Sequence, residues 1–147
     1  MRILWYPEAT GSVQPTIPPE PITDGPNDLS KITILVVDDA SDWRRDNSEY
    51  LSKEFSCKVL TATDVDEALT VLQTNKVDLI VSDLNMGEKG GLDLARQRPQ
   101  NIPFILISNH LPSDLDTNDL NIRAKIRKGD MDTLTNTIRN IFRDAES

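Results

Sequence analysis

The sequence predicts an α/β fold, with a parallel β-sheet covered by helices on both faces. From residue 31 onward, short runs rich in Val, Ile and Leu alternate with segments of helical spacing, which is typical of repeated βαβ units. These runs are apolar almost throughout, as expected for strands that are buried on both faces. Residues 1–30 differ, because they hold six of the nine prolines, one arginine and four acidic residues. We expect this Pro-rich segment to be a flexible N-terminal tail.

The first half of the domain contains two strand–helix units. The first strand is predicted over 32–37 and the first helix over 41–55, where apolar residues recur at about helical spacing. They are Trp43, Tyr50, Leu51 and Phe55. The second strand is predicted over 58–62 and the second helix over 64–74, which begins at a Thr63/Asp64 cap. Its apolar stripe is Val65, Ala68, Leu69 and Leu72.

The second half continues the alternation. Its strands are predicted over 77–82, 103–108 and 123–126. Its helices are predicted over 91–98, 113–120 and 130–143, and the first two of these have weak helical patterns. The last helix begins at an Asp130 cap and turns four apolar side chains inward. They are Leu134, Ile138, Ile141 and Phe142.

Composition restricts the possible partners and compartments. The formal net charge is −8, which argues against direct binding of nucleic acid or of an anionic membrane surface. No stretch approaches the roughly 18 consecutive apolar residues of a membrane helix. The single cysteine, Cys57, excludes an internal disulfide and fits a reducing compartment. We therefore expect a cytoplasmic protein in which Cys57 is a small buried apolar residue.

Polar residues follow the predicted strands at the edge where parallel sheets bind ligands. Asp38 and Asp39 follow the first strand, Asp83 the third, and Ser108 ends the fourth, while Lys128 stands just beyond the fifth. Neighbouring carboxylates repel each other and need a cation, and oxygen ligands suit Mg²⁺. The lysine could neutralise a phosphoryl group to which the serine donates one hydrogen bond.

This constellation, with "VDLIVSDLNM" leading into Gly-Gly-Leu, resembles the receiver domain of bacterial two-component response regulators. The resemblance runs from about Lys31 to Phe142 and implies a receiver domain over 31–147. It implies a flavodoxin-like, doubly wound five-stranded sheet of strand order 2-1-3-4-5. It also implies phosphorelay signal transduction, in which Asp83 takes a phosphoryl group from a sensor histidine kinase or a histidine phosphotransfer protein.

The resemblance assigns further roles. Asp39 would bind Mg²⁺ directly and Asp38 through water, while Asp83 and the backbone carbonyl of Asn85 complete the protein ligands. Ser108 would be the switch hydroxyl and Lys128 the phosphate-binding lysine. A carboxylate can form an aspartyl phosphate, and phosphoryl transfer needs little beyond alignment and charge neutralisation. The implied protein is a self-phosphorylating and autodephosphorylating switch rather than a turnover enzyme.

Several residues depart from the family pattern. Gly129 follows Lys128, where the family usually has proline, and Lys125 stands where many receivers carry an aromatic switch residue. Asn109 replaces a usual Ala or Gly, so we expect it to slow phosphorylation. His110 lies where a side chain can tune hydrolysis of the phosphoryl group, although a histidine without a role fits equally well. The third helix is short, and Asp46 and Asn47 stand where the first helix usually turns apolar residues inward.

The output is open between several interpretations. A stand-alone receiver would bind a downstream protein after phosphorylation or relay the phosphoryl group. A degenerate receiver would bind its partner without phosphorylation, as Lys125, Asn109 and Gly129 suggest. The chain could also be a fragment of a larger response regulator. Three basic residues alternate along the last predicted strand, either as a solvated face or as a patch for an acidic protein. They are Arg123, Lys125 and Arg127.

Overall fold

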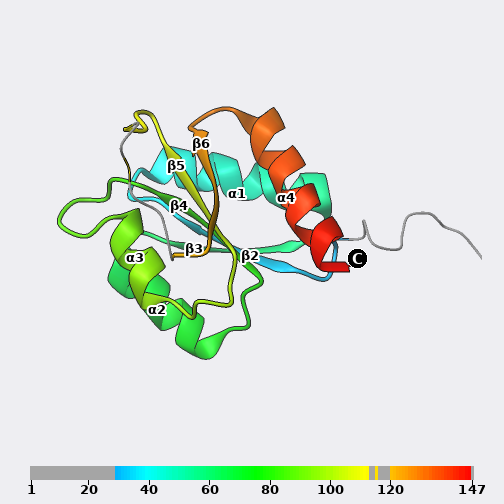
Figure 1. Cartoon of the computed structure of the whole chain (residues 1–147), viewed down its shortest axis with the longest axis horizontal. Helices are drawn as coiled ribbons and strands as arrows, with labels where there is room; N and C mark the ends of the chain where they lie inside the picture. Colours follow the sequence, from blue (N-terminus) through cyan, green and yellow to red (C-terminus); the bar gives the residue numbers. More distant parts are fainter. Residues whose placement is uncertain (1–28, 113–114, 116–119, 147) are drawn as a thin grey trace, which may run out of the picture.

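The computed structural model describes residues 29–112, 115 and 120–146, and in these ranges five parallel strands form one sheet (Figure 1). The strands are β2 (Thr33–Val37), β3 (Lys58–Ala62), β4 (Leu79–Asp83), β5 (Phe104–Ser108) and β6 (Ile122–Arg127). Their order across the sheet is β3-β2-β4-β5-β6, which is 2-1-3-4-5 when they are counted along the chain. The predicted fold class is therefore confirmed.

Helices cover both faces of this sheet. They are α1 (Ser41–Phe55), α2 (Val65–Thr74), α3 (Gly91–Gln97) and α4 (Met131–Glu146). Figure 1 shows α1 and α4 on one face and α2 and α3 on the other. The helix predicted over 113–120 lies almost entirely outside the described residues, as do residues 1–28 of the predicted tail. None of the described helices is long and apolar enough to cross a bilayer.

The sheet separates two apolar clusters, and β2 contributes to both. Ile34 and Val36 pack with α1 and α4, whereas Leu35 and Val37 pack with α2 and α3. All four side chains are buried, as predicted for a strand in the middle of a parallel sheet. Cys57 is also buried, in the cluster beneath α1 and α4. Burial raises the pKa of its thiol, which fits the predicted role as an apolar core residue.

The first helix does not bury every residue of its predicted stripe. Leu51 and Phe55 are buried, but Tyr50 is 37% exposed and is the large apolar residue that points outward. Asn47 is buried on the inner side of α1 instead. The third helix is seven residues long, in agreement with the expected shortening.

A buried arginine closes the α3 end of the molecule. Arg98 is 2% exposed, and its guanidinium donates hydrogen bonds to the carbonyls of Ala95, Ile102 and Asn121. Its cationic carbon also lies 5.1 Å from the ring centroid of Phe104. Arg98 therefore ties the carboxyl end of α3 to the loop before β5 and to the start of β6.

Candidate functional site

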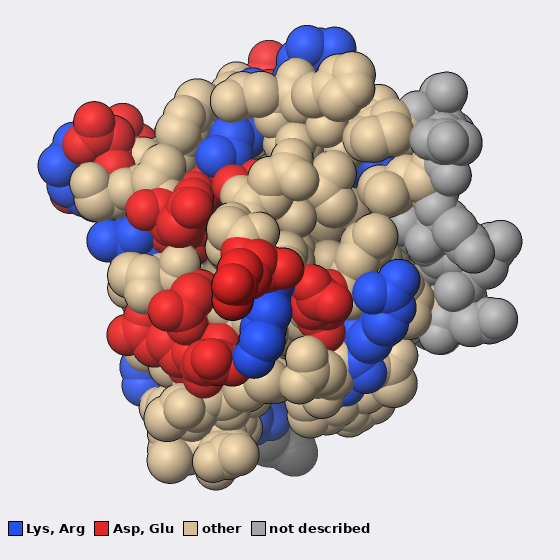
Figure 2. Space-filling view, turned by 90° about the vertical axis from the view of Figure 1, so that its left-hand side faces the viewer, with Lys and Arg blue, Asp and Glu red and all other residues tan. Residues whose placement is uncertain are grey.

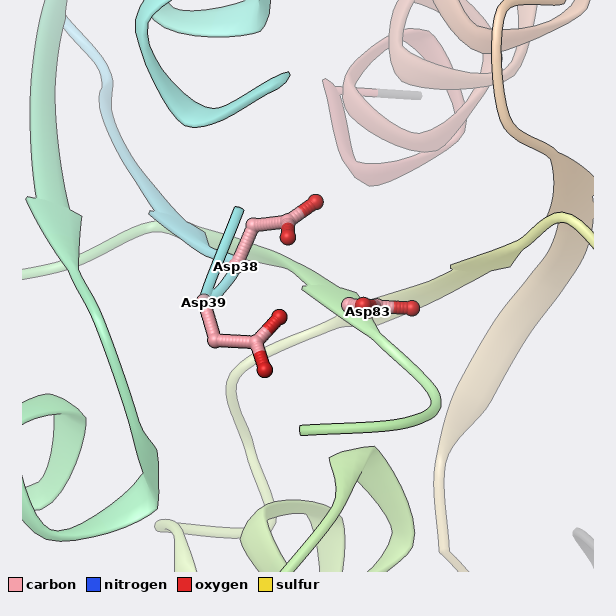
Figure 3. A group of neighbouring side chains, drawn as sticks. All are labelled: Asp38, Asp39 and Asp83. Atoms are coloured by element: carbon pink, nitrogen blue, oxygen red, sulfur yellow. The ribbon is translucent and has the colours of Figure 1, made fainter. Parts of the chain in front are cut away.

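Three carboxylates meet at the carboxyl edge of the sheet. Asp38 follows β2 directly, Asp39 is the next residue, and Asp83 is the last residue of β4. Figure 3 shows their side chains converging from the two neighbouring strands, and one oxygen of each lies within 4.8 Å of the others. Asp38 and Asp83 are buried, whereas Asp39 is exposed. The sequence prediction that these three residues come together is confirmed.

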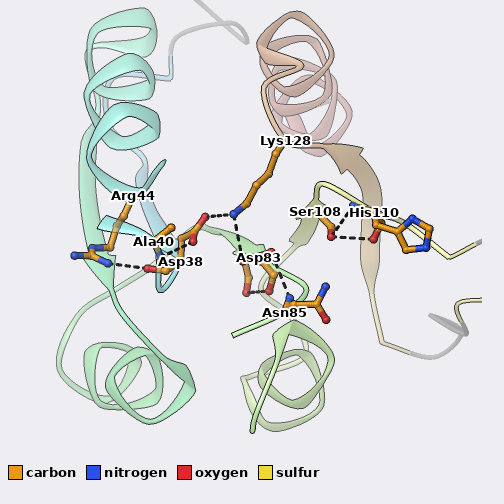
Figure 4. Close-up of polar contacts among 9 residues, drawn as sticks. Asp38, Ala40, Arg44, Asp83, Asn85, Ser108, His110 and Lys128 are labelled. Carbon is orange, nitrogen blue, oxygen red and sulfur yellow. Dashed lines mark hydrogen bonds and ion pairs between the residues drawn. The ribbon is translucent and has the colours of Figure 1, made fainter. Parts of the chain in front are cut away.

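Lys128 supplies positive charge to the two buried carboxylates. Its Nζ lies 2.9 Å from Asp38 Oδ2 and 3.3 Å from Asp83 Oδ2 (Figure 4), and its side chain is only 6% exposed. Burial alone would lower the pKa of Lys128, but its contacts with Asp38 and Asp83 outweigh that effect and raise it. The lysine is therefore held as a cation between the two strands.

Asp83 is positioned by the loop that follows it. Its Oδ1 accepts a hydrogen bond of 3.3 Å from the backbone N–H of Asn85. Burial raises the pKa of Asp83 and the charge of Asp38 adds to this, while the bonds from Asn85 and Lys128 act against it. The carboxylate thus lies in a poorly solvated position, where an added cation stabilises its ionised form.

The Gly-Gly pair explains how α3 can start so close to this strand end. A Cβ on Gly90 would lie 2.3 Å from the carbonyl oxygen of Leu84, and one on Gly91 would lie 2.5 Å from that of Asp83. Both distances are impossible for a larger residue without a shift of the backbone. Gly91 also donates its N–H to Leu84 O at 2.9 Å. Close approach, which glycine permits, therefore fixes the backbone around Asp83.

Asp38 is held from the side of α1. Its Oδ1 accepts from the N–H of Ala40 at 2.9 Å, and its backbone carbonyl accepts from the guanidinium of Arg44 at 2.8 Å (Figure 4). Its Oδ2 is fully buried and has no hydrogen-bond partner among the described residues, so that the ion pair with Lys128 is its contact. A buried carboxylate oxygen with spare capacity, close to two further carboxylates, fits a hard divalent cation.

Ser108 does not point its hydroxyl at Asp83. The Oγ donates to the carbonyl oxygen of His110 at 2.9 Å and accepts from the N–H of the same residue at 3.1 Å. Figure 4 shows this pair lying apart from the contacts of Lys128. Asn109 and His110 are exposed. The serine therefore lies at the predicted strand end, but its hydroxyl is bonded to its own loop.

The predicted output strand is an exposed edge. Lys125 lies on β6, which pairs only with β5 in the sheet. Its side chain and those of Arg123 and Arg127 are exposed, whereas Ile126 between them is buried. The three basic side chains thus share one exposed side of the strand, as their alternation predicted.

Acidic side chains dominate the surface around the site. Figure 2 looks onto the edge at which the strands end, and it shows a cluster of Asp and Glu side chains with a few basic ones among them. Asp64, Asp66 and Glu88 line a neighbouring hollow of about 210 Å³. Lys89 contacts Asp66 there at 3.0 Å. The negative surface around the pocket attracts cations.

The glycine after Lys128 does not displace the lysine. Gly129 has a φ of +90°, a value that the ring of proline excludes. The backbone of Lys128 is held against the end of β5, because its N–H donates a hydrogen bond to Ser108 O at 3.0 Å. The turn is therefore built differently from one with proline, yet the ammonium still reaches both carboxylates.

Sequence reasoning missed two residues of the site. Trp43 belongs to the predicted apolar stripe of α1, but its ring centroid lies 5.5 Å from Lys128 Nζ. Arg44 is not among the predicted site residues, yet its guanidinium donates a hydrogen bond to the carbonyl of Asp38. Their position in the sequence could have indicated a place near the site, because both residues belong to the first turn of the helix that follows the acidic pair.

The fold and site define a doubly wound α/β protein with an acidic pocket at its carboxyl edge, whose three carboxylates are capable of holding a metal ion. The family model described as the response regulator receiver domain matches residues 34–139, and the chain belongs to that family.

Solved structures agree with this assignment. The response regulator TrrA from Thermotoga maritima, determined in complex with Mg²⁺-BeF, has a TM-score of 0.67 and 27% identity, over 75% of this chain and 98% of that one. The chemotaxis protein CheY4 of Vibrio cholerae has a TM-score of 0.69 over 76% of this chain and 99% of that one. With 22% identity, the second comparison shows the fold alone.

Curated relatives are longer proteins. The protein-glutamate methylesterase/protein-glutamine glutaminase of Bacillus subtilis is 35% identical over 81 residues, which are 53% of this chain and 23% of that protein. The regulatory protein VirG of Agrobacterium tumefaciens is 34% identical over 85 residues, which are 56% of this chain and 32% of that protein. This chain thus spans about a quarter to a third of the length of these two relatives.

Proposed function

We propose that this receiver accepts a phosphoryl group on Asp83 from the phosphohistidine of a sensor histidine kinase or a histidine phosphotransfer protein, with Mg²⁺. The observation that carries the proposal is the placement of the Lys128 ammonium between the buried carboxylates of Asp38 and Asp83. A structural ion pair needs one carboxylate, whereas Lys128 pairs with two, and the third carboxylate beside them, that of Asp39, leaves charge for a further cation.

The transfer itself uses few groups. A carboxylate oxygen of Asp83 attacks phosphorus, and the new O–P bond forms as the bond from phosphorus to the imidazole nitrogen breaks. Lys128 neutralises charge on the phosphoryl oxygens as a point charge. Ser108 turns from the His110 backbone to donate a hydrogen bond to the phosphoryl group. The reaction needs alignment and charge neutralisation rather than a general base.

Asp38, Asp39 and Asp83 are the carboxylates that would hold the metal, together with the backbone carbonyl of Asn85. Asp39 and Asp83 would bind it directly and Asp38 through water. When bound, Mg²⁺ supplies charge that offsets the repulsion between the carboxylates and the phosphoryl oxygens. Asp38 Oδ2, which is buried and contacts only the Lys128 ammonium among the described residues, supports this assignment.

Hydrolysis returns the receiver to its starting state, so the protein acts as a switch that gains and loses its own phosphoryl group. Ser108, Asn109, His110 and Lys125 are the proposed output residues. A shift of the Ser108 hydroxyl would move the exposed loop beside it and bias two arrangements of that surface. Output is then binding of a downstream protein or relay of the phosphoryl group. A cytoplasmic location stays a prediction from the single cysteine.

A second candidate is a degenerate receiver that binds its partner without phosphorylation. It is favoured by the bonding of the Ser108 hydroxyl to His110 and by the exposed lysine at position 125. A receiver domain within a longer regulator, as in the curated relatives, is compatible with either candidate.

The test is intact-protein mass after incubation with acetyl phosphate, with and without Mg²⁺. A Mg²⁺-dependent gain of one phosphoryl group, absent from Asp83→Asn, is expected. If neither acetyl phosphate nor the phosphorylated cognate kinase gives that gain, the phosphoacceptor proposal is wrong. Equal binding of the downstream partner by the wild type and Asp83→Asn would then establish the degenerate receiver.

A further inference from the structure

An aromatic ring lies against the lysine of the site. The ring centroid of Trp43 is 5.5 Å from Lys128 Nζ, within the roughly 6 Å at which a ring face attracts a cation. Trp43 stands on the first turn of α1 and is partly buried. The ammonium of Lys128 therefore lies beside two carboxylates and an indole ring. The proposed phosphoryl transfer gives no role to the ring.

The same ring also touches the turn that carries the lysine. A Cβ on Gly129 would lie 3.5 Å from Trp43 Cη2, at ordinary contact distance. Asn47, one helical turn further along α1, is buried and lines a small hollow with Lys128 and Gly129. One face of α1 thus packs against the turn between β6 and α4.

This packing restrains a turn whose two residues, Lys128 and Gly129, are flexible. Glycine at a φ of +90° has wide conformational freedom, and the four-carbon stem of lysine has many rotamers. Neither residue would hold an ammonium at a fixed place by itself. The carboxylates attract the ammonium but also repel an incoming phosphoryl group, so a neutral restraint has a separate use.

We infer that Trp43 is a positioning residue, whose indole ring keeps the Lys128 ammonium and the Gly129 turn in place for phosphoryl transfer to Asp83. The inference rests on the proposed function, because it assigns a role within that reaction. Trp43 itself touches neither the phosphoryl group nor Asp83. It acts by limiting where Lys128 can go when its partners change from two carboxylates to a carboxylate and a phosphoryl group.

The first test needs no phosphorylation. In metal-free protein, NMR should find the Cε protons of Lys128 shifted by the ring current of Trp43. Trp43→Phe keeps an aromatic ring and should keep part of that shift, whereas Trp43→Leu should remove it. Tyr50→Leu is the matched control, because it removes an exposed ring from the same helix. Lys128 signals that are the same in Trp43→Leu and in the wild type would overturn the inference.

The second test measures the rate of phosphorylation by acetyl phosphate with Mg²⁺. Trp43→Leu should lower the maximal rate about fivefold, equivalent to about 1 kcal/mol. The donor concentration that gives half of that rate should change less. Trp43→Phe should restore the rate to within about twofold of the wild type, and Tyr50→Leu should leave it unchanged. Circular dichroism of each variant checks that the domain is folded.

The two tests separate the inference from the function on which it rests. A phosphorylated wild type with an unchanged rate in Trp43→Leu would overturn the inference and leave the phosphoacceptor function standing. A wild type that takes no phosphoryl group from donor or kinase would overturn both, even if the ring-current shift is present. A reduced rate that Trp43→Phe fails to restore would also contradict a role that depends on the ring.

Discussion

Two regions of the site differ in how they are held. The charge centre, which consists of Asp38, Asp83 and Lys128, is buried and joined across three strands by ion pairs of 2.9 and 3.3 Å. The output segment, residues 108–110, is largely exposed and bonded to itself through the Ser108 hydroxyl and the His110 backbone. The two regions are joined by a backbone hydrogen bond of 3.0 Å from the N–H of Lys128 to the carbonyl oxygen of Ser108.

The difference between the buried charge centre and the exposed output segment indicates where a conformational change can occur. The charge centre is assembled before any phosphoryl group arrives, so little reorganisation is needed for transfer. In the proposed switch, the Ser108 hydroxyl would exchange its two hydrogen bonds to His110, each worth about 1 kcal/mol, for one with a charged acceptor worth about 2 kcal/mol. The two arrangements are therefore close in free energy, and a phosphoryl group can shift the balance between them.

The largest effect is expected from Lys128→Met. It leaves two buried carboxylates without their cation, so the free energy of unfolding should fall by about 3 kcal/mol in metal-free buffer. Phosphorylation should also be lost. Urea unfolding measures the first effect. Lys125→Met, on the strand that precedes Lys128, is the exposed control and should change stability by less than about 0.5 kcal/mol. Equal effects of the two variants would remove the distinction between the regions.

Ser108→Ala should have a smaller effect, confined to the output segment. It removes both bonds of the hydroxyl to His110, and about 2 kcal/mol of stability is expected to be lost. The amide hydrogen of His110 should exchange faster while the amide hydrogens of β2 and β4 keep their protection. Hydrogen exchange followed by NMR measures this. Faster exchange throughout the sheet would show that the two regions are one cooperative unit.

The pH dependence of the free energy of unfolding tests the burial of Asp83 in the charge centre and leaves Lys128 unchanged. Burial raises the pKa of Asp83 above its usual value of 3.8, so the folded protein holds this proton more tightly than the unfolded chain. Stability in metal-free buffer should therefore fall as the pH rises from about 3.8 through the raised value. Asp83→Asn should lack this component. A ¹³C titration of Asp83 that shows a pKa below 3.8 would contradict it.

Asn109→Ala should change stability least, by less than about 0.5 kcal/mol, because the side chain is exposed. Its effect should be on rate, since a smaller residue beside Ser108 opens access to Asp83. Phosphorylation by acetyl phosphate should be faster than in the wild type. An unchanged rate would mean that Asn109 does not restrict access to the site.

The elements and the strand ends could be predicted because they depend on patterns within short segments. The apolar runs located all five strands to within about two residues, and the order of the polar residues after them brought Asp38, Asp83 and Lys128 together. These residues meet because the parallel topology places the carboxyl ends of all the strands at one edge of the sheet. The predicted metal ligation and phosphoryl transfer remain predictions.

Side-chain direction and unusual burial could not be predicted in the same way. Ser108 has the expected place, but its choice between the His110 backbone and Asp83 depends on loop geometry. Arg98 reads as a surface residue, because arginine is rarely buried, yet three carbonyls from separate segments enclose it. Tyr50 follows helical spacing but faces solvent. Each of these outcomes depends on contacts between segments that are distant in sequence.

The spacing of the charge centre along the chain has a consequence for biosynthesis. Asp83 and Lys128 are 45 residues apart, and Asp38 precedes Asp83 by the same interval. At about 5–20 residues per second, a ribosome needs roughly 2–9 seconds to make the second interval. Throughout that time the nascent chain contains the acidic residues but lacks the lysine that joins them. A partly synthesised chain therefore lacks both ion pairs of the charge centre until Lys128 has been added.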